Sequence, residues 1–169
     1  MALTEVRKRT SQASYLDIAG NAASTPEFEF MGTGFTELNE EPGAQTSSKR
    51  YVNNSAATRA ITGYEWQTPF NADQIKSEKA IKYIIDVGKF QKNGAEAETD
   101  YIIVDLDEAA AGENAFAARK FHVAIEVASF TDNDGEMGCE GNLLGVGDPV
   151  VGTFNTTTKT FAEGVQVGS

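Results

Sequence analysis

Residues 115–130 read AFAARKFHVAIEVASF, the longest clean alternation of apolar and polar side chains in the chain. Successive side chains of a β-strand point to opposite faces of its sheet. One face comprises Ala117, Arg119, Phe121, Val123, Ile125 and Val127, and the other Phe116, Ala118, Lys120, His122, Ala124, Glu126, Ala128 and Phe130. A strand this long, against a usual length of roughly 5–6 residues, predicts the centre of a sheet that is dry on the first face and meets water or a partner on the second.

Composition limits the classes of protein that are compatible with the chain. It has 169 residues, of which 25 are acidic and 14 basic, giving a formal charge of −11. A surface this acidic is repelled by nucleic-acid phosphates and anionic membranes, so we expect neither specific DNA binding nor membrane binding. The single Cys139 excludes an intramolecular disulfide. The N-terminus lacks the apolar core of a signal peptide and no window approaches the ~20 apolar residues of a membrane span, which predicts a cytosolic protein or one assembled there into something larger.

The chain is predicted to form one domain with two loose ends. Residues 1–25 are expected to be an N-terminal arm, residues 26–161 the β-domain, and residues 162–169 a C-terminal tail. Arg7, Lys8 and Arg9 form a basic cluster in the arm, which is either a solvated tail or a segment that docks on an acidic neighbouring copy.

The first half of the domain mixes strands with one long connection. Residues 28–38 predict one bent or two short strands, with Gly32 and Gly34 at the bend. Residues 40–58 are rich in Gly, Pro, Ser and Asn and predict a long loop of the kind that contacts a partner. A strand over residues 59–70 is expected to end at Pro69, followed by a helix over about residues 73–88 that is capped by Asn71 or Asp73 and lies on the sheet.

The second half predicts further short strands around the long one. In residues 101–107 the side chains of Ile102, Val104 and Leu106 are expected inward and those of Asp105 and Asp107 in water. Asp134-Gly135 has the chemistry of a tight hairpin turn. With strands at residues 142–146 and 150–154, the count is about seven or eight strands and one helix. The fold class is therefore mainly β, an antiparallel β-sandwich or barrel with one flanking α-helix, a long loop and extended terminal arms.

Candidate catalytic and metal-binding patterns fail on spacing. His122 is the only histidine, and no triad can be built from it with Cys139 or with a serine. Residues 132–135, DNDG, resemble the middle of a calcium loop, but Phe130 and Gly141 stand at its first and last ligand positions. Gly145 and Gly147 begin a dinucleotide-binding pattern, but Val150 stands where its third glycine belongs and no helix is expected to follow. The sequence predicts no enzyme, no cofactor and no metal.

The order of several short motifs resembles the major tail protein, or tail tube protein, of long-tailed bacteriophages. The resemblance covers about residues 28–161. Its motifs include Gly32, Gly34 and Phe35; Lys49, Arg50, Tyr51, Val52 and Asn53; Gly63 and Tyr64; Gly147, Asp148, Pro149, Gly152 and Phe154; and finally Lys159, Thr160 and Phe161.

The resemblance implies a structural virion protein made and assembled in the bacterial host cytoplasm. Its copies would form rings, usually hexameric, that stack into a hollow tube through which DNA is ejected without specific binding. Besides itself, its partners would be the tape measure, tail terminator and distal tail proteins. Contacts between subunits and rings are assigned to Arg7, Lys8, Arg9, Lys49, Arg50 and Tyr51, and the lumen face to Glu65, Lys120, His122 and Glu126. Acidic residues in the lumen would repel DNA.

Two other interpretations stay open. The same fold serves as the inner tube of a contractile tail or of a type VI secretion machine, which would require a sheath partner. A β-sandwich capsid decoration or carbohydrate-binding module would display aromatic side chains on a flat face, for which Tyr51, Tyr64 and Trp66 are candidates.

Overall fold

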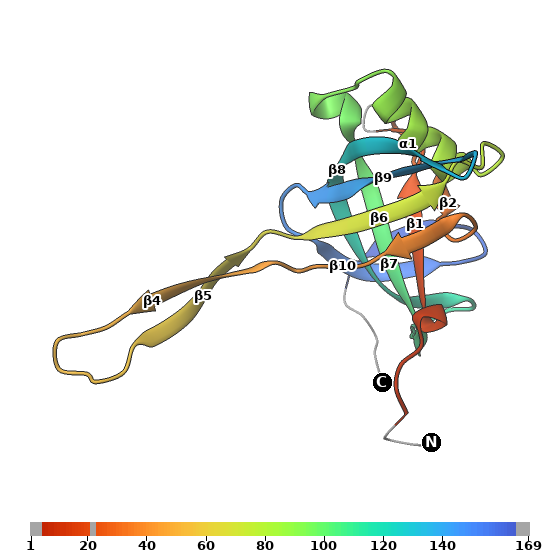
Figure 1. Cartoon of the computed structure of the whole chain (residues 1–169). Coiled ribbons are helices and arrows are strands. Elements are labelled where there is room, and N and C mark those ends of the chain that lie inside the picture. The colour runs from red at the N-terminus through yellow and green to blue at the C-terminus, as the bar shows by residue number, and fades with distance from the viewer. Residues whose placement is uncertain (1–4, 21–22, 165–169) are drawn as a thin grey trace.

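The computed structural model describes residues 5–20 and 23–164. Nine strands form one curled antiparallel sheet, and two more form a separate hairpin that projects from it (Figure 1). The strands are β1 (Gln12–Asp17), β2 (Phe28–Phe30), β3 (Phe35–Leu38), β4 (Ala44–Lys49), β5 (Thr58–Tyr64), β6 (Gln67–Asp73), β7 (Glu98–Ala109), β8 (Ala115–Asn133), β9 (Glu136–Gly145), β10 (Val150–Asn155) and β11 (Thr160–Glu163). The helix is α1 (Lys79–Lys89), and short 3₁₀ turns occur at Arg9–Ser11 and Gly94–Ala97. The mainly β prediction with one flanking α-helix is confirmed.

Strand β8 organises the sheet, as its sequence predicts. The sheet order is β2-β1-β7-β8-β9-β6-β3, and the first part of β8 also pairs with β10, which carries β11. On one face of β8, Phe121, Val123 and Ile125 are buried. On the other face, Glu126 is exposed. The turn to β9 is the predicted tight hairpin, because Asp134 and Gly135 both have positive φ, at 54° and 89°.

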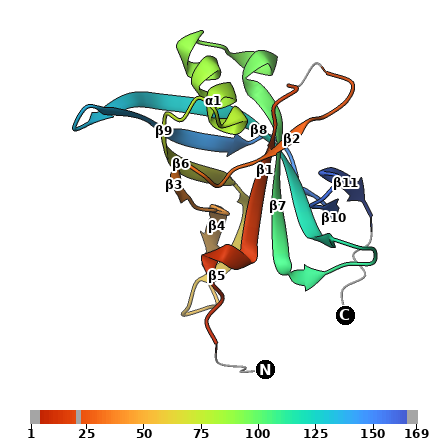
Figure 2. The ribbon, with the colours of Figure 1, turned by 90° about the vertical axis from the view of Figure 1, so that its right-hand side faces the viewer.

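The main core lies between the curled sheet and α1 (Figure 2). Helix α1 is amphipathic, and its buried side chains Ile81 and Ile84 are fully enclosed against sheet residues such as Phe121 and Leu143. Burying each such side chain contributes roughly 1.5–3 kcal/mol.

A second core occupies part of the face predicted to be wet. Ala118, Ile102 and Val104 pack there with the fully buried Phe154 of β10. Consequently β7 is buried on both faces from Tyr101 to Val104, and the expectation of one dry and one polar face holds only for the later part of β8. Of the β10–β11 hairpin that covers this end, β10 was predicted as the strand at residues 150–154, whereas the four-residue β11 is too short to show an alternation in the sequence.

The N-terminal arm is shorter than predicted. Strand β1 (Gln12–Asp17) lies between β2 and β7 and is almost entirely buried, so it belongs to the sheet. At the other end, β11 carries the sheet to Glu163, whereas residues 165–169 of the predicted tail lie outside the described part of the chain. The sheet therefore exceeds the predicted limits of 26 and 161 at both ends.

The predicted helix start and strand end are wrong. Helix α1 begins at Lys79, with Glu78 at the N-cap position, and both Asn71 and Asp73 belong to β6. Pro69 lies inside β6 beside the end of β3, where its carbonyl accepts a hydrogen bond from the Asn39 amide at 3.2 Å. Its missing N–H falls between the last β3 pair, Leu38↔Phe70, and the isolated bridge Glu41↔Gln67, where the pairing of β6 on this side is interrupted. The described residues contain no helix long and apolar enough to span a membrane.

Candidate self-assembly surfaces

The predicted long loop is an ordered hairpin that stands clear of the body (Figure 1). Strands β4 and β5 pair from Lys49↔Thr58 to Ala44↔Tyr64, so only residues 50–57 form a loop at the tip. Every residue of β4 is exposed, as is every residue of β5 except Gly63. A two-stranded hairpin without a packed face is marginally stable in water and leaves two strand edges free to pair.

The hairpin has the opposite charge to the rest of the chain. Residues 44–64 contain Lys49, Arg50 and Arg59 and no acidic residue, so a chain of net charge −11 divides into a hairpin of +3 and a remainder of −14. No carboxylate in the described part of the chain forms an ion pair with any of these three cations. At the tip, the side chain of Tyr51 is 56% exposed and Val52 is fully exposed.

The foot of the hairpin is held firmly to the sheet. The Glu40 carboxylate accepts hydrogen bonds from Arg119 at 2.7 and 3.0 Å and from the Trp66 indole at 2.8 Å. Burial opposes ionisation of Glu40, but the hydrogen bonds from Arg119 and Trp66 outweigh it and keep the pKa of Glu40 below its usual value. The Gly43 carbonyl then accepts the amide of Glu65 at 2.8 Å, and Gly43 has a φ of +64° that favours glycine. The hairpin is thus mounted on a rigid base.

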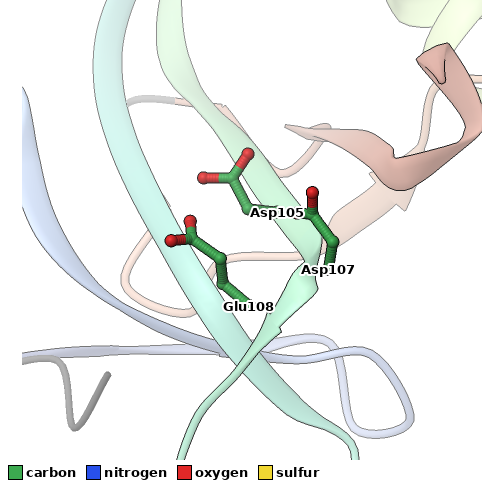
Figure 3. Close-up of side chains that lie close together, drawn as sticks. All are labelled: Asp105, Asp107 and Glu108. Atoms are coloured by element: carbon green, nitrogen blue, oxygen red, sulfur yellow. The ribbon is translucent and has the colours of Figure 1, made fainter. Parts of the chain in front are cut away.

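The basic cluster of the arm contacts its own chain. Arg7 binds Asp105 at 2.6 Å and Asp107 at 2.7 Å, and these two carboxylates lie close to that of Glu108 on β7 (Figure 3). The hydrogen bond from Arg7 keeps the pKa of Asp107 below its usual value. The expectation that both side chains lie in water holds for the exposed Asp107, whereas Asp105 is only partly exposed, and their shared ion pair with Arg7 was not predicted. The Arg7 guanidinium already supplies the positive charge that this acidic group attracts.

The other two members of the cluster differ from Arg7. Arg9 donates hydrogen bonds to the backbone carbonyls of Gln12 at 2.9 Å and of Leu38 at 3.4 Å. It thereby links β1 to β3, two strands that are not paired with each other in the sheet. Lys8 is exposed. Of the three predicted docking cations of the arm, two are thus used to hold the subunit's own fold.

Three of the four candidate lumen residues share one face of β8. Lys120 lies over the ring of Phe161 at 5.2 Å, and Glu126 accepts a hydrogen bond from Asn142 at 2.7 Å. His122 lies on the same face between them. The fourth candidate, Glu65, lies at the foot of the hairpin, away from this face.

His122 is held between two carboxylates that the sequence analysis missed. Its Nδ1 lies 2.9 Å from Asp100 and its Nε2 lies 3.0 Å from Glu98, both on β7. Burial lowers the pKa of His122, but the two carboxylates outweigh it and raise that pKa above its ordinary value. The spacing of two between Glu98 and Asp100 places them on one face of a strand and was the available signal.

The motif residues that carry the family resemblance are partly structural. Gly34 has a φ of +90°, and a Cβ there would meet Ile81 at 2.7 Å. Gly152 allows β11 to approach β10, because a Cβ would meet the Ala162 carbonyl. Phe154 is fully buried and Phe35 packs against the main core.

The remaining motif residues lie around the hairpin. Lys49, Arg50, Tyr51, Val52 and Asn53 lie at its tip, Gly63 and Tyr64 end β5, and Gly147, Asp148 and Pro149 form the β9–β10 connection. Gly32 is an exception, because it lies in the β2–β3 connection, separated from β2 by one residue. Tyr51 lies at the tip, beyond the Lys49↔Thr58 pair, whereas Tyr64 and Trp66 lie at the foot of the hairpin. The three aromatic side chains therefore do not form one flat binding face.

Comparison with known proteins supports the fold. No protein-family model and no curated protein sequence matches the chain. A chain from the tail of an empty GTA particle, determined by helical refinement with C6 symmetry, matches in structure with a TM-score of 0.56 and 10% sequence identity. The match covers 85% of this chain and 97% of that one. The protein thus has the fold of a tail subunit from a phage-like particle.

Proposed function

We propose that the protein is a structural tail subunit that assembles into stacked six-fold rings and forms the hollow tube through which DNA is ejected. The observation that carries this proposal is the β4–β5 hairpin, which is ordered, exposed along its length and cationic on an otherwise acidic chain. The likeness to a subunit of a C6-symmetric tail supports the ring symmetry.

The physics of the hairpin favours another copy of the chain as its partner. A surface of +3 is attracted to a body of −14, and docking would cover the two free strand edges. A hairpin that leaves one subunit and binds a different surface on the next makes a heterologous contact, which repeats without closing and builds a filament. On this model Lys49, Arg50 and Tyr51 contact the neighbouring ring.

The polar face of β8 is our candidate for the lumen wall. Its Glu126, with Glu98 and Asp100 beside His122, places carboxylates where passing DNA would be repelled rather than bound. In this role the protein works in the virion with the tape measure, tail terminator and distal tail proteins, and it performs no catalysis.

Negative-stain electron microscopy with light-scattering mass, over a series of protein concentrations, tests the proposal. We expect rings or hollow tubes of uniform width. A chain that stays monomeric at every concentration would refute self-assembly.

A matched deletion isolates the hairpin. Because Gly43 and Glu65 are already hydrogen-bonded to each other, residues 44–64 can be replaced by Asn-Gly without moving the body. We expect this variant to keep the circular dichroism spectrum of the fold and to lose stacking. Normal tubes from the deletion variant would show that the hairpin is not the stacking element.

A further inference from the structure

A groove of about 570 Å³ opens at the foot of the hairpin. Its walls come from the β5–β6 junction, from β8 and from the β9–β10 connection, which Figure 1 shows beside the hairpin base. The floor is aromatic, because Trp66 stacks on Phe121 with ring centroids 4.1 Å apart and planes inclined by 14°. The guanidinium of Arg119 lies 5.4 Å from the same Phe121 ring. Phe121 itself is buried, so the aromatic surface open to a ligand is that of the partly exposed Trp66 and the exposed Tyr64, within a polar rim.

The rim of this groove is negative. Arg119 is the cation among its lining residues, and Glu40 already neutralises it through two hydrogen bonds. Glu65 and Asp148 remain exposed on the rim, and no lysine or arginine of the described chain forms an ion pair with either. A ligand for this groove should carry positive charge at its edges and an aromatic or apolar group at its centre.

The groove is also rigid before anything binds. Glu40 ties the Trp66 indole to Arg119, so the aromatic floor keeps its orientation. Binding to a surface whose side chains are already held costs less conformational entropy than binding to mobile ones.

We propose that this groove receives the hairpin tip of a second copy of the chain. The inference rests on the proposed function and names the surface to which the hairpin docks. Lys49 and Arg50 match the two rim carboxylates, and the exposed ring of Tyr51 fits the aromatic floor. The other tip residues, Val52 to Ala57, carry no charge, so nothing there opposes the negative rim.

A subunit cannot fill its own groove. Tip and groove lie at opposite ends of the β4–β5 ladder, whose six-residue β4 strand spans roughly 20 Å. Each copy therefore donates one tip and receives one, and the contact propagates in a single direction. This polarity is what a stack of identical rings requires.

Charge reversal on the full-length chain tests the docking site. The tip variant combines Lys49→Glu with Arg50→Glu, the groove variant combines Glu65→Lys with Asp148→Lys, and a third variant carries all four changes. All four side chains are exposed, so circular dichroism should confirm an unchanged fold. We expect each two-site variant to raise the protein concentration needed for tubes at least ~10-fold and the four-site variant to restore it, because the reversed charges match again.

Two further readouts sharpen this test. Trp66 is the only tryptophan, so its emission should change on assembly of the wild-type and four-site chains and stay constant in the tip variant. The control for the groove variant combines Glu113→Lys with Glu136→Lys, which makes the same change in net charge as the groove variant at exposed positions outside the groove lining, and it should assemble normally.

The outcomes separate the groove from the hairpin. If the tip variant forms tubes as well as the wild type, the hairpin tip does not stack the rings and the docking proposal is overturned, whereas the proposed function stands because tubes still form. A wild-type chain that forms no tubes would overturn the proposed function itself. If the tip variant is blocked while the groove variant assembles, or if the four-site variant stays blocked, the groove assignment is overturned and the role of the hairpin stands. Loss of assembly in the Glu113 and Glu136 control would overturn a site-specific interpretation.

Discussion

Replacing Glu40 with alanine should lower the free energy of unfolding by about 2–3 kcal/mol. The Glu40 carboxylate accepts two hydrogen bonds from Arg119 and one from the Trp66 indole. Its removal leaves a partly buried guanidinium without a counter-charge and an indole N–H without its acceptor. Breaking a fully buried ion pair costs about 3–5 kcal/mol. The two side chains here keep 21% and 32% of their exposure, so water recovers part of that loss.

Urea unfolding below the assembly concentration measures this change. With a slope of about 2 kcal/mol per molar urea, the midpoint should fall by about 1–1.5 M. Trp66 fluorescence and far-ultraviolet circular dichroism should report the same midpoint, which excludes a purely local effect on the indole. The control is Glu41→Ala, the next residue, whose exposed carboxylate accepts a hydrogen bond from Gln67 and whose loss should change stability by less than about 0.5 kcal/mol.

The pH dependence of the difference gives a second check. The folded-state pKa of Glu40 lies below its unfolded value of roughly 4.3, so its contribution is present above that pH and is lost as pH falls through the folded value. The wild type and Glu40→Ala should therefore converge in acid. Equal midpoints for the two chains at pH 7 would refute the view that this carboxylate anchors the hairpin foot.

Three further substitutions test other parts of the structure. Because the folded-state pKa of His122 is raised, its stabilising contribution is full below its unfolded pKa of about 6.5 and is lost as pH rises through the folded value. Urea midpoints of the wild type should therefore fall across that pH range, whereas those of His122→Gln should not. Gly34→Ala, at a φ of +90° and against Ile81 of the helix, should lower the free energy of unfolding by about 2–4 kcal/mol. Gly63→Ala, with nothing within 4 Å of its added Cβ, should lower it by less than about 0.5 kcal/mol. Equal thermal midpoints for the two variants would contradict this. Ile125→Asp, at a core position that is only 5% exposed, should yield insoluble or unfolded protein because it buries a charge. Ala128→Asp, at an exposed position of the same strand, should yield soluble folded protein. Equal solubility of the two variants would show that Ile125 does not lie in the core.

The sequence predicts an element well where one face of it meets the chain's own core and the other meets water. The later part of β8 satisfies this condition, and so does the buried side of α1. Strand β1 does not, because it lies inside the sheet with nearly all of its residues buried, and a short strand buried on both faces carries no alternation. For this reason the sequence places residues 12–17 in the predicted N-terminal arm instead of in the sheet.

Contacts between side chains on neighbouring strands were harder to predict than the face of the strand on which each side chain lies. Lys120, His122 and Glu126 share a face of β8 because strand geometry requires it. Their neighbours depend on the register between β7 and β8, and that register shifts between Asp105 and Ala109 before the strand turns. Periodicity within one strand carries no information on such a shift, so the carboxylates around His122 became visible only in three dimensions.

The β4–β5 hairpin was only half predicted: β5 falls in the strand expected over residues 59–70, whereas β4 was assigned to a loop, for a reason that agrees with the proposed role of the hairpin. Alternation in a strand records burial against the rest of the same chain, and neither face of this hairpin is buried there. A strand that is buried only against a second molecule needs no apolar stripe of its own, provided that its partner supplies the apolar surface, as the Trp66 and Phe121 floor of the groove does in our proposal. An apolar stripe along two free edges would also pair indiscriminately before assembly. In our proposal, selection of the partner by charge at Lys49 and Arg50 would avoid that hazard, and it would leave β4 without the apolar alternation by which a strand is recognised.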